Sequence, residues 1–395
     1  MDRKIELLAP AGDIERLKIN LLYGADAVYI GGQEYSLRAN ATNFSIEEIK
    51  EGCSFAHKLG KKVFLTLNIV MHNEDLEGLE EYIKEVVDAG IDAFIVSDPC
   101  IISHIVDNYP QVEAHLSTQN STSNYVAVNY FKQEGVKRVV LARELNKEEI
   151  KEIIDKTGLD IEVFIHGAMC TCFSGRCALS NYVTNRDANR GGCAQVCRFA
   201  FEAREEKDFT FATCDLNMAE YIKDMIDIGV KSLKVEGRMR SLYYLAVVIG
   251  TYRELIDDIY ANSLTTEKLK EYQERLDRVA NRKTTTHFFT KFADENDQYY
   301  TGRQEISNQD YLGQIIEYKD NLIKIYERNY FEVGDTVEVF TPNHEREEFV
   351  VKRLLDEDKN EIDVARHPDS IYYVELKTKI KIPEYSMLKI IKRNK

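Results

Sequence analysis

The chain has 395 residues, of which 44% are apolar and 30% charged, and its formal net charge is −15. This length fits two domains, or one large barrel with an appendage, better than a single small core. The negative charge argues against a broad nucleic-acid surface, and no apolar run approaches the roughly 18–20 residues that span a bilayer.

The N-terminal residues do not resemble a secretion signal. Asp, Arg, Lys and Glu all occur within the first six positions, so an apolar stretch is missing there. We therefore expect a cytoplasmic protein without a membrane partner. In that compartment disulfides are disfavoured, and clustered cysteines bind metal or carry out redox chemistry.

Short apolar segments alternate with amphipathic segments over the first 260 residues. Strands are predicted at 5–9, 26–30, 62–67, 92–96, 112–116, 138–142, 161–165 and 232–235. Helices are predicted at 13–23, 45–59, 76–89, 101–108, 125–134, 147–157, 218–228 and 243–260. Eight such units are typical of a TIM-type (β/α)8 barrel, with a doubly wound open sheet as the alternative.

The pattern changes in the last third of the chain. A charged helix is predicted at 265–282, followed by short strands at 311–317, 322–326, 336–340, 349–354, 361–364 and 387–391. These strands predict a small all-β barrel. The expected domains are a TIM-like barrel over 1–262, a helical linker over 263–300 and the β-barrel over 301–395.

Five of the eight cysteines lie between positions 170 and 197, directly after the seventh predicted strand. They are Cys170, Cys172, Cys177, Cys193 and Cys197. Zinc favours paired CxxC spacings, and a catalytic thiol needs a base such as His166. Four thiolates at irregular spacing in a reducing compartment are better explained by an iron–sulfur cluster. The segment 166–215 is thus predicted to be an iron–sulfur insertion, which includes a hairpin at 199–204 and 209–213.

Polar residues follow several predicted strands, where a (β/α)8 barrel places its active site. The candidates are Asn68, Gln119, Arg143, His166, Glu236 and Arg238, together with Arg176 of the cysteine-rich segment. Arginine binds carboxylates in a bidentate manner, so we expect Arg143, Arg176 or Arg238 to hold a substrate carboxylate, with Asn68 lining the same pocket. His166, Glu236 and Gln119 are the candidate catalytic residues. The alternative for the arginines is pairing with acids such as Glu144 and Asp187.

Longer motifs resemble peptidase family U32. The run EVFIHGAMCTCFSGRCALS at 162–180 fills every fixed position of that family's signature. The runs ELLAPAG at 6–12, NRDANRGGCAQ at 185–195 and LKVEGRM at 233–239 resemble the family as well. The resemblance covers the barrel and, with the β-domain, nearly the whole chain.

The resemblance implies functions of different classes. The family is named for collagenase-like proteolysis, but several branches are oxygen-independent hydroxylation factors with a 4Fe–4S cluster. They act on the wobble uridine of tRNA with prephenate, on a cytidine of ribosomal RNA, or on the ubiquinone ring. The β-domain makes this chain most like the tRNA branch, because the quinone factors resemble the barrel alone and the rRNA branch has longer extensions. The alternatives are a protease, an rRNA or quinone hydroxylase, or a cluster-bearing accessory factor that works with a paralogous U32 protein.

By the same resemblance, Cys170, Cys177 and Cys193 match cluster ligands. The fourth ligand stays open, because some relatives have a cysteine where this chain has Asn217; Cys214 or Cys197 would complete the set. No HExxH, GxSxG or papain-like motif occurs in the chain, which argues against proteolysis. RNA is expected to bind the β-domain and the barrel rim, with bases stacking on tyrosines.

Overall fold

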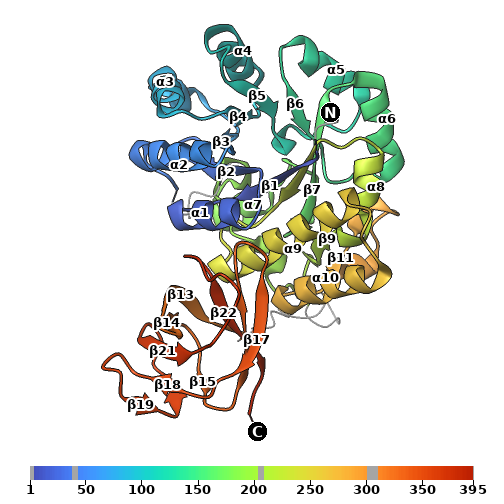
Figure 1. Cartoon of the computed structure of the whole chain (residues 1–395). Helices are drawn as coiled ribbons and strands as arrows, with labels where there is room; N and C mark the ends of the chain where they lie inside the picture. The colour runs from blue at the N-terminus through green and yellow to red at the C-terminus, as the bar shows by residue number, and fades with distance from the viewer. Residues whose placement is uncertain (1–3, 38–42, 203–208, 300–309, 395) are drawn as a thin grey trace.

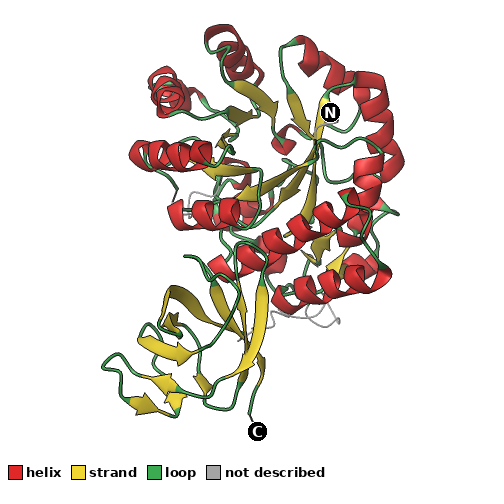
Figure 2. Ribbon diagram, viewed as in Figure 1, coloured by secondary structure: helices red, strands yellow, loops and turns green. Residues whose placement is uncertain are grey.

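A computed structural model describes residues 4–37, 43–202, 209–299 and 310–394 (Figure 1). Two parts are evident: a barrel surrounded by helices, and a β-domain that lies against one side of it (Figure 2). Among the described residues, no helix combines the length and the apolar character needed to cross a bilayer.

Eight parallel strands form the barrel. They are β1 (Glu6–Pro10), β2 (Ala27–Gly31), β3 (Lys62–Leu67), β4 (Ala93–Val96), β5 (Glu113–Leu116), β6 (Arg138–Val140), β7 (Asp160–Gly167) and β10 (Ser232–Val235). Each strand pairs with the next, and β10 pairs with both β7 and β1, so the sheet is closed. The predicted (β/α)8 barrel is confirmed, and the open sheet is wrong.

The helices that surround the barrel follow the predicted order. They are α1 (Ile14–Leu22), α2 (Ile46–Lys58), α3 (Leu79–Ala89), α4 (Pro99–Asn108), α5 (Tyr125–Gln133), α6 (Lys147–Thr157), α8 (Ile222–Asp227) and α9 (Leu242–Tyr260). Ser45 and Glu48 form the expected capping box at the start of α2. Helix α8 is shorter than predicted, because residues Ala219–Tyr221 form a separate 3-10 turn.

A buried ion network fills the N-terminal half of the barrel. Arg138 contacts both Glu6 and Glu162 (Nη1–Oε2 of Glu162 3.1 Å), and Lys234 Nζ donates to Glu162 Oε1 at 2.8 Å. All four side chains are buried. Two positive and two negative charges balance, which makes their burial in a low-dielectric interior tolerable.

The insertion after β7 adds a small layer at the C-terminal end of the barrel. It contains α7 (Leu179–Thr184), β8 (Ala212–Thr213) and β9 (Asp215–Asn217). Strand β9 runs antiparallel to β7, and β8 pairs with β12 (Gln298–Tyr299). Of the predicted hairpin, the described residues contain an antiparallel bridge between Phe201 and Phe209, while 212–213 pair with β12. Residues 203–208 of the hairpin lie outside the described residues.

The C-terminal part is the predicted all-β domain. Its main sheet is antiparallel, in the order β17-β16-β22-β13-β14-β21-β18-β19. The longer strands are β13 (Tyr311–Lys319), β14 (Leu322–Glu327), β16 (Thr336–Phe340), β17 (Arg346–Val350), β21 (Ile371–Glu375) and β22 (Met387–Lys392). Strand β21 was not predicted. The strand predicted at 349–354 is wrong, because β17 ends at Val350 and β18 (Leu354–Leu355) begins separately.

The β-domain is held against the outer side of α1 and α9. The hydroxyl of Tyr23, the C-cap of α1, donates to the Tyr385 carbonyl at 2.9 Å, and Tyr243 of α9 stacks on Tyr311 at 4.9 Å. Phe340 packs against both Tyr23 and Tyr243 and joins the core of the barrel. Helix α10 (Thr266–Val279) packs beside α9 and contributes Arg278, which pairs with Asp310.

Candidate functional site

The cysteine segment, defined as residues 168–201, lies over the C-terminal mouth of the barrel. Beyond β3, the Val70 amide donates to the Asn189 carbonyl at 3.0 Å, and Arg190 donates to the Val70 carbonyl at 2.8 Å. Beyond β6, the Ser174 amide donates to Glu144 at 2.8 Å. These two contacts, together with a third beyond β5, hold the segment at the C-terminal ends of the strands. Barrel enzymes have their active site at this end.

The contact beyond β5 depends on a glycine. Gly175 has a φ of +68°, and a Cβ at this position would lie 2.0 Å from the carbonyl oxygen of Gln119. Only glycine permits both this left-handed backbone and this close approach. The segment therefore passes directly over Gln119.

The tertiary structure brings five cysteines together. Burial raises the pKa of Cys172 to about 12, and further increases come from a hydrogen bond with Cys177 and from the charges of Cys170 and Cys197. Burial also raises the pKa of Cys197, as do the neighbouring thiolates of Cys170, Cys193 and Cys177. The hydrogen bond between Cys172 and Cys177 and the electrostatic effects among the other thiols indicate that the cysteines clustered in sequence also lie in one region of the structure.

Cys214 lies apart from this group. Its thiol is buried and faces the Asn296 carbonyl at 3.7 Å. After burial, the main groups that shift its pKa are Lys283, Asp297, Tyr299 and Asp215, so its surroundings differ from those of the clustered thiols. Of the two candidates for a fourth ligand, Cys197 is therefore the one that lies with Cys170, Cys177 and Cys193.

The cysteines do not converge as they would around one metal ion. Among the described residues, no three His, Cys, Asp or Glu side chains are placed to hold a single ion. A 4Fe–4S cluster does not require such convergence, because its four cysteine ligands bind four different irons. The chemistry of the donor set, five thiols in one place with few competing ligands, fits a cluster of that kind.

Beneath the cysteine segment, Arg143 and Glu236 lie at the ends of β6 and β10. The Arg143 guanidinium stacks on Phe164 at 3.7 Å and donates to the Ala168 carbonyl at 2.8 Å. Its Nη2 is 3.9 Å from Glu236 Oε2, and the Tyr29 hydroxyl donates to the same oxygen at 3.3 Å. A cation and an anion are therefore positioned side by side at the mouth.

Asn68 and Gln119 add polar atoms at neighbouring strand ends. Asn68 Nδ2 donates to Ser117 Oγ at 3.1 Å. Asn68 Oδ1 and Gln119 Oε1 are buried without a hydrogen-bond partner in the described part of the chain. Buried polar atoms without partners are rare in proteins and are costly unless a ligand or water satisfies them.

His166 does not face the mouth. Its ring packs 5.5 Å from Tyr252 and 6.0 Å from Tyr244, both on α9, and its Nδ1 is 3.2 Å from the Tyr252 hydroxyl. Burial, with a smaller effect of Arg240, lowers the pKa of His166 to about 3. A neutral, enclosed imidazole is poorly suited to the predicted proton transfer.

The other two arginines differ in environment. Arg238 is buried and donates to Ser36 Oγ at 3.1 Å and to the Leu37 carbonyl at 3.0 Å, so it fixes the loop after β2. Arg176 is exposed on the cysteine segment. The two predicted acid partners bind other groups. Glu144 accepts a hydrogen bond from Ser174, and Asp187 accepts one from the Asn189 amide.

Sequence reasoning missed Tyr29 and Lys234 as parts of this region. Lys234 Nζ lies 4.4 Å from the centre of the Tyr29 ring, and Tyr29 in turn reaches Glu236. These side chains connect the buried ion network to the mouth. A lysine inside an otherwise apolar strand is the signal that marks this position, because a buried lysine requires a partner.

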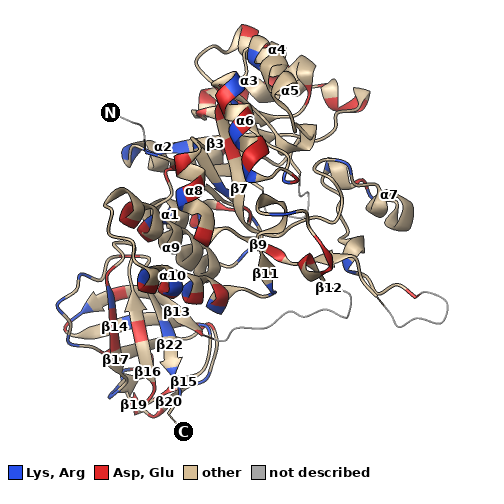
Figure 3. Cartoon of the chain, turned by 90° about the vertical axis from the view of Figure 1, so that its right-hand side faces the viewer, with Lys and Arg blue, Asp and Glu red and all other residues tan. Residues whose placement is uncertain are grey.

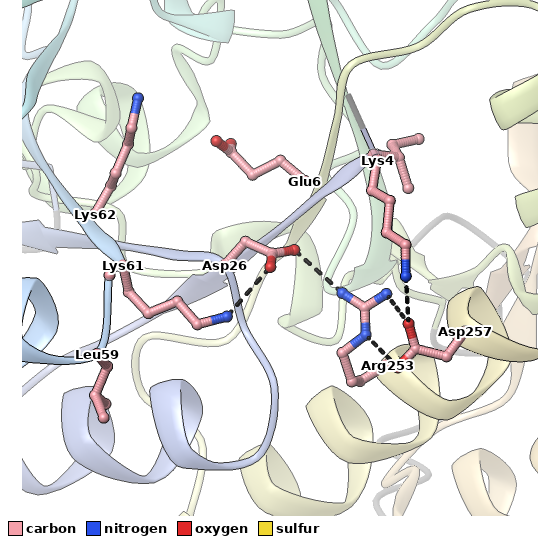
Figure 4. Close-up of a pocket in the computed structure, with 10 residues that line it drawn as sticks. Lys4, Glu6, Asp26, Leu59, Lys61, Lys62, Arg253 and Asp257 are labelled. Carbon is pink, nitrogen blue, oxygen red and sulfur yellow. Dashed lines mark hydrogen bonds and ion pairs between the residues drawn. The ribbon is translucent and has the colours of Figure 1, made fainter. Parts of the chain in front are cut away.

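A hollow of about 610 Å³ lies at the opposite end of the barrel (Figure 4). Several of its charged side chains pair with one another: Asp26 accepts from Lys61 at 3.3 Å and from Arg253 at 3.2 Å. It lies at the N-terminal ends of the strands, where barrel enzymes do not carry out their chemistry. The mouth, which holds the thiols and the buried amides without partners, is the better candidate.

The fold and the site first define a class of protein: a closed (β/α)8 barrel with a cysteine cluster over its mouth and an all-β domain on its side. Comparison with known families then identifies the particular family. Residues 12–299 match the model of Peptidase family U32, and residues 307–389 match that of the Peptidase family U32 C-terminal domain. The chain belongs to peptidase family U32.

Three relatives carry names of different functions. The chain is 46% identical to tRNA hydroxylation protein P1 of Bacillus subtilis, over 96% of this chain and 93% of that protein. It is 37% identical to the 23S rRNA 5-hydroxycytidine C2501 synthase of Escherichia coli, over 65% of this chain but only 40% of that protein. It is 32% identical to a protein of Porphyromonas gingivalis named Collagenase, over 80% of this chain and 81% of that protein.

Proposed function

We propose that the protein is an RNA-modifying enzyme that hydroxylates the wobble uridine of tRNA, with prephenate as co-substrate and a 4Fe–4S cluster as cofactor. The observation that carries the proposal is the 46% identity with a tRNA hydroxylation protein over nearly the full length of both chains. The rRNA relative extends far beyond the part that this chain covers, so it supports RNA hydroxylation in general but not its own substrate here.

Cys170, Cys177, Cys193 and Cys197 are the proposed cluster ligands. Their proximity supports this set, whereas the separate position of Cys214 argues against it as a ligand. When bound, such a cluster would supply one-electron transfer or Lewis-acid chemistry at the barrel mouth.

Arg143 is the proposed anchor for a carboxylate of the co-substrate. Stacking on Phe164 and the hydrogen bond to the Ala168 carbonyl fix the guanidinium and direct Nη2 toward Glu236. The 3.9 Å between Arg143 Nη2 and Glu236 Oε2 is too long for a hydrogen bond, so the two groups attract each other only through their charges. The N–H groups of Nη2 can therefore donate to a ligand. Asn68 Oδ1 or Gln119 Oε1 would accept from the single hydroxyl group of that co-substrate.

The decisive experiment is nucleoside mass spectrometry of tRNA from a deletion strain that expresses either the wild type or single variants. Wild type should restore 5-hydroxyuridine-derived wobble nucleosides, Cys197→Ser should restore at most a few per cent, and Cys214→Ser should restore them as wild type does. Iron and sulfide counts after anaerobic purification should fall for Cys197→Ser only. Unchanged wobble nucleosides in the deletion strain, with no paralogue present, would refute the tRNA assignment and leave the peptidase activity to be assayed on collagen.

A further inference from the structure

The cysteine segment has more basic than acidic residues, whereas the protein as a whole is acidic. Residues 168–201 contain four arginines and one aspartate, although the chain as a whole carries a net charge of −15. Residues 310–394, the described β-domain, contain 14 Lys and Arg against 18 Asp and Glu. A polyanion is therefore attracted to the cysteine segment more than to the β-domain.

Two of the four arginines are available to a partner. Arg190 pairs with Asp75 and Glu74, and Arg198 donates to Gln195 at 2.7 Å. Both side chains therefore already have partners within the protein. Arg176 and Arg186 are exposed, and neither side chain contacts an acid in the described part of the chain.

Aromatic side chains stand beside these two arginines. Tyr182 is 90% exposed and Phe173 is 69% exposed, which is unusual for large rings. Phe173 is in the same turn as Arg176, whose amide donates to the Phe173 carbonyl at 3.1 Å. Tyr182 is on α7, and Arg186 lies two residues beyond the end of that helix. We call Phe173, Arg176, Tyr182 and Arg186 the α7 surface.

The α7 surface is held firmly. Asn189 accepts from the Cys177 amide at 3.3 Å and donates to the Cys177 carbonyl at 2.9 Å, which closes the loop that contains α7. The Ala194 amide donates to Ser180 Oγ at 3.1 Å and ties α7 to the next turn. The exposed rings are thus presented by a fixed backbone, which lowers the entropy that binding would cost.

The position of this surface suits a substrate that must reach the mouth. Figure 3 shows α7 at the edge of the molecule, on the far side from the β-domain. Cys177, one of the clustered thiols, lies two residues before α7. A polymer bound along α7 would therefore pass beside the barrel mouth.

We propose that the α7 surface binds a single-stranded RNA loop, with bases stacked on Tyr182 and Phe173 and phosphates held by Arg176 and Arg186. Unpaired bases stack on aromatic rings, and arginine binds phosphate through paired donors. This inference rests on the proposed function. The sequence led us to expect RNA on both the β-domain and the barrel rim, and the inference assigns its binding to the cysteine segment at the rim.

The test measures binding of a fluorescent tRNA anticodon stem–loop to the full-length, cluster-loaded protein. Tyr182→Ala should weaken binding at least fivefold, because one stacked base is lost. Arg186→Ala should weaken binding of all loop sequences and reduce the slope of log affinity against log salt by about one. Phe292→Ala is the matched control, since Phe292 is 86% exposed but lies outside the segment.

A second control separates the two candidate surfaces. Lys377, Lys379 and Lys381 form the exposed basic run of the β-domain, and their joint replacement by alanine should leave binding unchanged. Loss of binding in that variant but not in Tyr182→Ala and Arg186→Ala would overturn the inference, as would the absence of binding by wild type. If wobble hydroxylation still depends on the gene while the α7 variants bind normally, the proposed function stands and only this inference fails.

Discussion

At the scale of single residues, the balance of charge inside the barrel is the most sensitive feature. Burial alone would raise the pKa of Glu162, but the attraction of Lys234 and Arg138 outweighs it and lowers the pKa to about 2. The carboxylate is therefore ionised although its side chain is fully buried. Because two cations depend on it, its loss would leave a net positive charge in the core.

Glu162→Gln should lower the free energy of unfolding by about 3–5 kcal/mol, the usual effect of breaking a buried ion pair from one side. Urea denaturation at pH 7 measures this. The stability that ionised Glu162 contributes should be complete above pH 4.5 and should decline as the pH falls toward 2. The reason is that the pKa of this carboxyl is lower in the folded state than in the unfolded state. As a control, Lys151→Ala breaks an exposed pair with Asp155 and should cost less than about 1 kcal/mol. A loss for Glu162→Gln as small as the control's would contradict the network's role.

At the scale of elements, the cysteine segment depends on its contacts with the strand ends more than on regular structure of its own. Its helix α7 has only six residues, and its cysteines come from turns on either side of that helix. The close contact between Gly175 and the Gln119 carbonyl is one of those that fix the distance of the cysteine segment from the barrel mouth. A displacement there would move the thiols relative to one another.

Gly175→Ala should reduce bound iron and sulfide by more than half, because the added methyl group would collide with the Gln119 carbonyl. Elemental analysis of anaerobically purified protein measures this. Gly158→Ala is the matched control: Gly158 also has a positive φ, of +58°, but nothing lies within 4 Å of its added Cβ. Both variants incur backbone strain of about 1 kcal/mol. Equal iron contents in the two variants would show that the close contact is unimportant.

At the scale of the whole molecule, the β-domain and the barrel share part of their core. Phe340 of β16 and Met387 of β22 belong to the apolar cluster of the barrel, and Glu254 of α9 contacts Arg346 of the β-domain at 2.8 Å. This interface places the β-domain on the side of the barrel. Because the two parts share a core, we expect them to unfold together.

Phe340→Ala should divide the single thermal transition expected for wild type into two, because it removes the ring that packs against Tyr23 and Tyr243. Truncation of a buried phenylalanine costs about 3–5 kcal/mol. Differential scanning calorimetry distinguishes one transition from two. Ile316→Ala, at an exposed position on β13, should melt as wild type does. A single transition in Phe340→Ala would mean that the other contacts suffice.

Much of the fold could be predicted because local rules determine it. The strands at 62–67 and 232–235 have the predicted limits, and Ser45 with Glu48 starts α2 as expected. The alternation of strands and helices led to the closed barrel. Strand β21 was missed because its pattern is short and its pairing with β14 is set by distant residues.

The site was predicted less completely, as His166 illustrates. Glu162 and Phe164 point into the barrel, so simple alternation would place His166 there as well. The pairing of β7 with β10 shifts between Lys234 and Val235, and His166 consequently lies opposite Val235 and faces α9. Such a bulge reverses the direction of a side chain and leaves no clear mark in the sequence.

The sequence by itself determined the barrel, the all-β domain and the presence of five thiols after the seventh strand, because periodicity and residue type are local properties. The tertiary structure decided which thiols gather, that Cys197 and not Cys214 lies with the others, and which arginines face solvent. These are outcomes of packing between segments far apart in the chain: Cys214 is held by residues near 296, and Arg238 by the loop after β2.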